Sequence, residues 1–205
     1  GAVPEATVDE AVRRVLRVKF ALGIFDHPYV DENARLYQAT PEKRALARMA
    51  AEESIVLLQN GTREGQPKLL PIAPHVKTIA PIGPMADSQG EMLGSWPGAG
   101  NSADAITLRT ALEQHMQNLG GKVIYAEGTR ILTASDKGFD AAKQAARQAD
   151  LVVVALGEDG PTMTGEAASR AHLDLPGNQE QLLETIVATG KPVVLVIFSG
   201  RPLVL

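Results

Sequence analysis

Residues 151–156 form the apolar run LVVVAL, the feature that most limits how this chain can fold. The run is too short for a buried helix and is rich in β-branched valine, which predicts a strand covered on both faces. A second run of the same kind, PVVLVIF, occupies residues 192–198. Strands of this composition are typical of parallel sheets that lie between layers of helices.

Strand-like and helix-like segments alternate from about residue 54 onward, which predicts an α/β fold with a mainly parallel sheet sandwiched by helices. Thr40 and Pro41 predict a capped helix start, because Pro is favoured at the first helical position. The expected helices span residues 41–54, 106–117, 137–148 and 178–189, and the expected strands span residues 54–60, 76–82, 122–126, 151–156 and 192–198.

An amphipathic helix is predicted over residues 8–22, with Thr7 and Glu10 forming a capping box and Gly23 ending it. Valines and leucines recur along one side of this segment at helical spacing. No segment directly after it can cover that apolar side. We therefore expect the helix to pack on another domain, or on a second copy of the chain in a homodimer.

Composition and motifs exclude several classes of function. The net charge of −4 gives no basic surface for nucleic acid, and the chain has no cysteine for disulfides or thiolate metal ligands. The longest apolar run is about seven residues, too short for a membrane span. No signal peptide, dinucleotide-binding glycine motif or phosphate loop is present, and the four histidines are isolated. We expect no metal and no cofactor. Ser199 lacks a nucleophile elbow and is interpreted as a polar strand-end residue.

The loop after the strand at 151–156 carries several ionisable residues, and ligands of open α/β sheets bind beyond the carboxyl ends of strands. Glu166 lies between small residues, Gly165 and Ala167, which leave room for a ligand. A carboxylic acid in such a place could act as a general acid. The alternative is an ordinary polar connection in which Glu166 and Arg170 form a surface ion pair worth under about 1 kcal/mol.

Six blocks of the sequence resemble glycoside hydrolase family 3, in particular its bacterial periplasmic β-glucosidase type. In chain order they are VDEAVRRVLRVKFALGIFDHPYV, ARMAAEESIVLLQN, IAPIGPMAD, GSWPGAG, ADLVVVALGEDGPTMTGEAASRAHLDLPGNQEQLL and GKPVVLVIFSGRPLVL. Each block is weakly specific alone, but the ordered set spans nearly the whole chain.

The resemblance implies a three-part organisation of a piece of a longer protein. Residues 1–24 match the terminal helix of a (β/α)8 barrel, residues 25–40 match a linker, and residues 41–205 match an α/β sandwich domain that is incomplete at its C-terminal end. The family hydrolyses β-linked glucosides with retention, using two carboxylates about 5 Å apart. Its Asp nucleophile lies on the barrel, and this chain has no counterpart of it.

The family pattern also implies roles for individual residues. Glu166 matches the general acid/base, and Arg170 matches a basic residue that follows it. Trp96 matches an aromatic position near the sugar, although packing within its loop is an equal alternative. Glu158 is a further supporting residue, to which the acid role would pass if Glu166 did not hold it.

We therefore expect part of a retaining β-glucosidase that acts on β-glucosides or oligosaccharides, inactive without its barrel domain and periplasmic or secreted in its parent protein. Two other classes remain as alternatives. One is a non-catalytic carbohydrate-binding or structural α/β module. The other is a flavodoxin-like nucleotide binder, which the missing phosphate-loop glycines disfavour.

Overall fold

The computed structural model describes residues 2–31, 39–61, 68–164 and 168–205. The chain divides into two compact units, residues 1–55 and residues 56–205. The first unit holds α1 (Glu5–Ala21) and α2 (Pro41–Ser54), and neither helix has a buried residue. No helix in the described parts of the chain has the length and apolar character needed to cross a membrane.

The starts of the two N-terminal helices test two cap predictions. Thr40 caps α2 as predicted, since its Oγ1 accepts a hydrogen bond of 3.4 Å from the Lys43 amide. The capping box at Thr7 is wrong: α1 begins at Glu5, and no side chain caps it at Pro4. The Thr7 amide donates to the Pro4 carbonyl at 3.0 Å, which places Thr7 inside the first turn. Pro4 has its fixed φ of −61° directly before the helix.

Four parallel strands form one sheet in the second unit, in the order β2–β1–β3–β4. The strands are β1 (Thr78–Ile82), β2 (Lys122–Val123), β3 (Leu151–Gly157) and β4 (Val193–Phe198). Every residue of β3 is buried, as expected for a central strand between helical layers. The parallel α/β fold predicted from the sequence is therefore confirmed.

The predicted strand at residues 54–60 is wrong. Ser54 ends α2, and residues 55–60 pair with no strand in the described part of the chain. The side chains at 55–58 are between 64% and 82% exposed. An apolar, β-branched segment becomes a strand only when a neighbouring strand satisfies its backbone, and local sequence cannot supply that neighbour.

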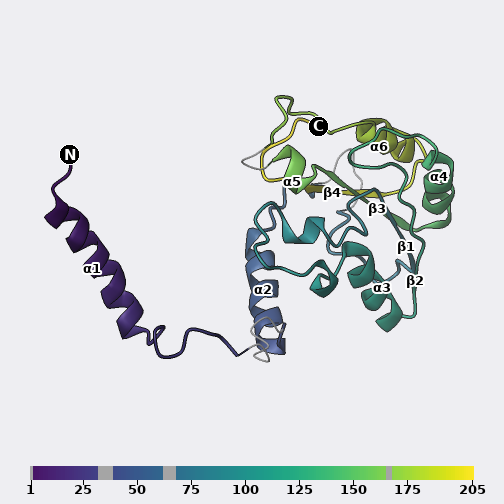
Figure 1. The fold of residues 1–205 in the computed structure, drawn as a ribbon. Helices are drawn as coiled ribbons and strands as arrows, with labels where there is room; N and C mark the ends of the chain where they lie inside the picture. Colours follow the sequence, from purple (N-terminus) through teal and green to yellow (C-terminus); the bar gives the residue numbers. More distant parts are fainter. Residues whose placement is uncertain (1, 32–38, 62–67, 165–167) are drawn as a thin grey trace. The chain divides into compact units, whose positions relative to one another are not determined.

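Helices cover both faces of the sheet, which gives three layers (Figure 1). On one face, α4 (Phe139–Gln148) and α6 (Gln179–Val187) pack their alanines, Leu182 and Ile186 against the strands. On the other face, α3 (Leu108–Asn118) inserts Met116 against Ile79, Leu151 and Val153. The alternation of β3 side chains between these two clusters is the period of a strand that is buried on both sides.

The strand order fixes where loops meet. The chain leaves β1 through α3 to reach β2, but leaves β3 through α5 (Gly160–Met163) and α6 to reach β4 on the opposite side. The carboxyl ends of β1 and β3 therefore form a topological switch point, the usual ligand site of such sheets. Gly157 ends β3 here, and a Cβ on it would lie 1.9 Å from the Phe198 carbonyl oxygen, so only glycine permits this approach of β3 to β4.

Candidate active site

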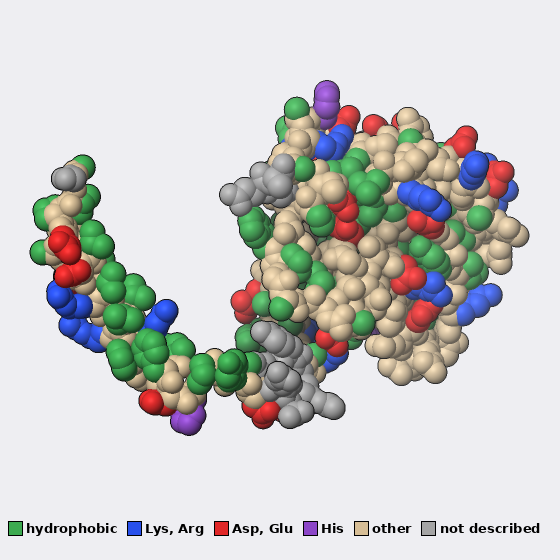
Figure 2. Space-filling view, viewed as in Figure 1, with side chains coloured by type: hydrophobic (Ala, Val, Ile, Leu, Met, Phe, Trp, Pro, Cys, Tyr) green, Lys and Arg blue, Asp and Glu red, His purple; other side chains and the backbone are tan. Residues whose placement is uncertain are grey.

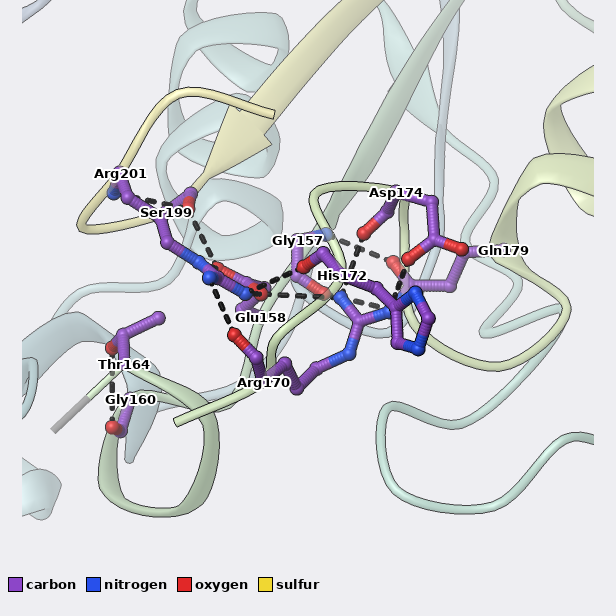
Figure 3. A network of polar contacts seen from close by, with 10 residues as sticks. All are labelled: Gly157, Glu158, Gly160, Thr164, Arg170, His172, Asp174, Gln179, Ser199 and Arg201. Carbon is purple, nitrogen blue, oxygen red and sulfur yellow. Dashed lines mark hydrogen bonds and ion pairs between the residues drawn. The ribbon is translucent and has the colours of Figure 1, made fainter. Parts of the chain in front are cut away.

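Glu158 is the first residue after β3, and its side chain is 0% exposed. Its Oε1 accepts hydrogen bonds from Arg201 Nη2 at 2.6 Å and from Arg170 Nη1 at 3.2 Å. Its Oε2 accepts from Ser199 Oγ at 3.0 Å and from Arg201 Nε at 3.1 Å. The network in Figure 3 thus gives this buried carboxylate four donors on residues distant in sequence.

The electrostatics keep Glu158 ionised. The hydrogen bonds from Arg201, and then those from Ser199 and Arg170, hold its pKa below the usual range although burial alone would raise it. A carboxylate with a lowered pKa carries no proton near neutral pH, and this one has no free face. Glu158 is thus placed to organise its neighbours and unsuited to donate a proton.

Arg170 joins Glu158 to the far end of the same loop. Besides Glu158, its guanidinium bonds the carbonyl oxygen of Asp174 at 2.7 Å and forms an ion pair with the Asp174 carboxylate. We call residues 158–174 the β3 loop. The structure brings two of the predicted site residues, Glu158 and Arg170, into direct contact across the base of this loop.

Backbone pairing joins the two described parts of the β3 loop, residues 158–164 and 168–174. Thr164 and Ser169 form an antiparallel bridge, and the Arg170 amide donates to the Met163 carbonyl at 3.0 Å. Glu166 itself lies outside the described residues, and so does its predicted pairing with Arg170. The described legs before and after it are held side by side at the carboxyl end of β3.

A second loop meets the β3 loop through Ser95, the neighbour of Trp96. Ser95 Oγ lies 3.0 Å from the Gly160 carbonyl oxygen and 3.1 Å from Thr164 Oγ1. Trp96 itself is 76% exposed, so its ring is not part of the core of the domain. The predicted aromatic residue is therefore next in sequence to a residue that contacts the leg leading to position 166.

Glu91 also contacts the β3 loop, where its Oε2 accepts from the Gly160 amide at 2.8 Å. Burial and the neighbouring Asp159 carboxylate raise the pKa of Glu91. Asp159 also caps α5 by accepting from the Thr162 amide at 2.9 Å. The carboxyl groups of Glu91 and Asp159 therefore lie close together at the start of the β3 loop, and each accepts a hydrogen bond from a different backbone amide.

Three residues of this network were missed or undervalued by sequence reasoning. Ser199, predicted to be a polar strand-end residue, directly follows β4 and also donates a hydrogen bond to Glu158. Arg201 was not predicted to have a role. Gln179 is fully buried, and its side-chain amide makes two 2.8 Å hydrogen bonds with the backbone of Gly157. The available signal was position, because Ser199 and Arg201 follow the carboxyl end of an apolar strand parallel to β3.

Other possible sites do not include the predicted residues. A cavity of about 910 Å³ lies beyond the end of β2, and its lining includes Thr129, Arg130 and Lys137. Within the described ranges, no three histidine, aspartate or glutamate side chains are grouped to hold a metal ion. The β3 loop is therefore the best-supported candidate site.

The second unit is an α/β domain, with a parallel sheet between helices and a carboxylate-bearing loop at the switch point of the sheet. Within that class, residues 55–205 match the sequence model of the glycosyl hydrolase family 3 C-terminal domain. This match covers more than half of the chain, and the chain belongs to that family.

Individual relatives agree with the family match. The chain is 37% identical to a periplasmic beta-glucosidase of Salmonella typhimurium, over 100% of this chain and 29% of the relative. It is 35% identical to a beta-xylosidase of Formosa agariphila, over 96% of this chain and 27% of the relative. Its fold is similar to that of the beta-glucosidase of Listeria innocua in complex with isofagomine, with a TM-score of 0.80, 40% identity, and coverage of 99% of this chain and 27% of that one. The chain thus spans less than a third of each of these proteins.

Proposed function

We propose that this chain is the domain of a retaining β-glucosidase that supplies the general acid/base, Glu166. One observation carries the proposal: the legs before and after Glu166 are paired at Thr164 and Ser169, at the switch-point edge of the sheet. Ligands of open α/β sheets bind at that edge. The family match and the sequence resemblance support the same role.

In the proposed reaction, an Asp of a barrel domain attacks the anomeric carbon while Glu166 gives its proton to the leaving glycosidic oxygen. Glu166 then takes a proton from the water that hydrolyses the covalent glucosyl-enzyme. Arg170 and Glu158 hold the loop that carries it. Trp96 is proposed to contact the sugar, because its exposed ring lies next to Ser95, which contacts Thr164.

The proposed partners are a β-glucoside or oligosaccharide substrate and a family barrel domain. Hydrophobic side chains run along α1 in Figure 2, and Val8, Val12 and Val15 are about half exposed. We propose that residues 1–24 belong with the barrel, that 25–40 link it to the sandwich domain of 41–205, and that the barrel covers this stripe. If a second copy covers it instead, sedimentation of the chain alone will give a dimer. By its relatives, the parent protein is proposed to be periplasmic or secreted.

The chain alone should release no nitrophenol from nitrophenyl β-glucoside above background, because the proposed nucleophile is not among its residues. Joined to its barrel domain it should turn this substrate over. Since relatives include both a beta-glucosidase and a beta-xylosidase, nitrophenyl β-xyloside is the matched second substrate. A higher kcat/KM for the xyloside would move the proposal to a β-xylosidase.

The role of Glu166 is tested by Glu166→Ala in the enzyme that carries this domain. General acid/base assistance contributes about 10²–10⁴-fold. Cellobiose has a poor leaving group, so its turnover should fall by that order. Dinitrophenyl glucoside needs little protonation, so its glycosylation step should persist and the covalent intermediate should accumulate. Azide attacks without a base and should restore turnover.

Glu180→Ala is the matched control, because Glu180 is an exposed glutamate on α6 outside the β3 loop. It should leave both substrates unaffected. Equal losses on both substrates with no azide rescue would show that Glu166 is structural or only binds sugar. If the Glu166→Ala variant and its parent both bind glucose without turnover, the domain is a non-catalytic carbohydrate-binding module.

A further inference from the structure

Arg201 lies three residues beyond the end of β4 and binds Glu158, the first residue of the β3 loop. Its Nε and Nη2 bond the two oxygens of Glu158 at 3.1 and 2.6 Å, a bidentate pair. Bidentate arginine–carboxylate pairs fix geometry as well as adding energy, because two parallel donors match two acceptors. The Glu158 side chain is fully buried, and the Arg201 guanidinium lies beside it, between Glu158 and the backbone of Arg170 (Figure 3).

The same guanidinium also binds the backbone of the second half of the β3 loop, at residues 170 and 172. Nη1 donates to the Arg170 carbonyl at 2.6 Å, and Nη2 donates to the His172 carbonyl at 2.9 Å. One side chain therefore binds the incoming leg at Glu158 and the outgoing leg at 170 and 172. Its backbone amide is in turn placed by Ser199 Oγ, at 3.2 Å.

Arg170 connects Arg201 to the paired legs on either side of residue 166. Its carbonyl oxygen accepts from Arg201, while its amide donates to Met163 at 3.0 Å. Ser169, the residue before it, pairs with Thr164. Arg170 contacts both Arg201 and Met163, so a displacement of Arg201 should disturb the pairing between residues 163–164 and residues 169–170.

We propose that Arg201 is a positioning residue. By binding the β3 loop at residue 158 and at residues 170 and 172, it holds the acid/base in the position that catalysis requires. This rests on the proposed function of Glu166. The competing interpretation is that Arg201 contributes only to the stability of the domain. The two differ in kinetics, because a misplaced proton donor affects poor leaving groups selectively, whereas a loss of folded enzyme affects all substrates equally.

The experiment compares Arg201→Lys, Arg201→Ala and the control Arg147→Ala in the enzyme that carries this domain. Lysine keeps the charge near Glu158 but lacks the planar fork that makes four bonds at once. Arg147 is an exposed arginine of α4, outside the network. Each variant is assayed on cellobiose and dinitrophenyl glucoside, and hydrogen exchange is followed across residues 158–174.

Arg201→Lys should lower kcat/KM for cellobiose on the order of 100-fold, the cost of a misplacement near 1 Å, and for dinitrophenyl glucoside by less than about tenfold. Amides of the β3 loop should exchange faster while those of β3 and α4 are unchanged. Adding Arg201→Lys to Glu166→Ala should give little further loss on cellobiose, because the positioned group is already gone. Arg147→Ala should match the parent enzyme.

Equal losses on both substrates, or additive losses in the double variant, would overturn the positioning role. Where Arg201→Ala is unfolded by circular dichroism, the folded Arg201→Lys variant decides the question. Failure of the proposed function has a different signature: Glu166→Ala alone would then show no leaving-group dependence and no azide rescue, whatever Arg201→Lys does to hydrogen exchange.

Discussion

Two glutamates, Glu158 and Glu91, form hydrogen bonds at the start of the β3 loop, and their surroundings shift their pKa values in opposite directions. Glu158 is fully buried and accepts from Arg201, Arg170 and Ser199, and its pKa is lowered. Glu91 is only half-buried, accepts from the Gly160 amide and faces Asp159, and its pKa is raised. At Glu158 the hydrogen bonds from Arg201, Ser199 and Arg170 outweigh the effect of burial, whereas at Glu91 burial is the main cause of the raised pKa and the Asp159 carboxylate adds to it.

Removing the Glu158 carboxylate should give the largest effect. Glu158→Ala leaves Arg170 and Arg201 without their shared anion in a mostly buried place, with 20% and 24% of their side chains exposed. Breaking one partner of a buried pair costs about 3–5 kcal/mol, and we expect about 3 because both arginines keep some water contact. Urea unfolding of the chain, followed by circular dichroism, measures the change.

Glu180→Ala is again the control and should change the free energy of unfolding by less than about 0.5 kcal/mol. A loss below about 1 kcal/mol in Glu158→Ala would mean that the arginines find water or other acceptors without cost. The contrast with Glu91 would then fail, because the network around Glu158 would not be tightly coupled.

Acidification should weaken the same contact with a smaller effect. A carboxyl group with a lowered folded pKa stabilises the fold above its unfolded pKa, near 4.5, and that stabilisation is lost as pH falls through the folded value. The melting temperature of the parent chain should therefore fall more steeply below about pH 4.5 than that of Glu158→Gln, which cannot titrate there. Parallel curves for the two proteins, measured by calorimetry, would contradict the lowered pKa.

The sequence predicted the sheet well because the information was local. The runs at 151–156 and 192–198 are apolar throughout, and both form strands of the sheet. Only β3 is fully buried as predicted, because β4 comes last in the strand order and its residues are half-buried. The segment at 54–60 has similar composition but forms no strand among the described residues. Pairing is a non-local property, so composition alone could not separate these cases.

The site was only partly predictable for the same reason. Glu158 and Arg170 were identified within one continuous loop, but Arg201 lies 43 residues after Glu158 in the chain. Its role depends on β3 and β4 being neighbours in register, with Gly157 beside Phe198. Given that pairing, the residues after both strands must meet at one edge, and a charged residue there was the available clue.

The smallest effect is expected from Glu91→Gln, and it has the opposite sign. A group with a raised folded pKa contributes stability that is fully present below its unfolded pKa and is lost as pH rises through the folded value. At pH 7 the ionised Glu91 therefore costs free energy beside Asp159.

Glutamine has the same shape and keeps an oxygen for the Gly160 amide, so Glu91→Gln should raise the free energy of unfolding by up to about 1 kcal/mol, within the range of single stabilising substitutions. At pH 4 the gain should nearly vanish, because Glu91 is then largely protonated. Calorimetric melting at the two pH values measures this, with Glu113→Gln as control, since that change removes an exposed ion pair with Arg109 and should not stabilise. A lower melting temperature for Glu91→Gln at pH 7 would mean that the Gly160 hydrogen bond needs a charged acceptor, and the two glutamates would then act alike.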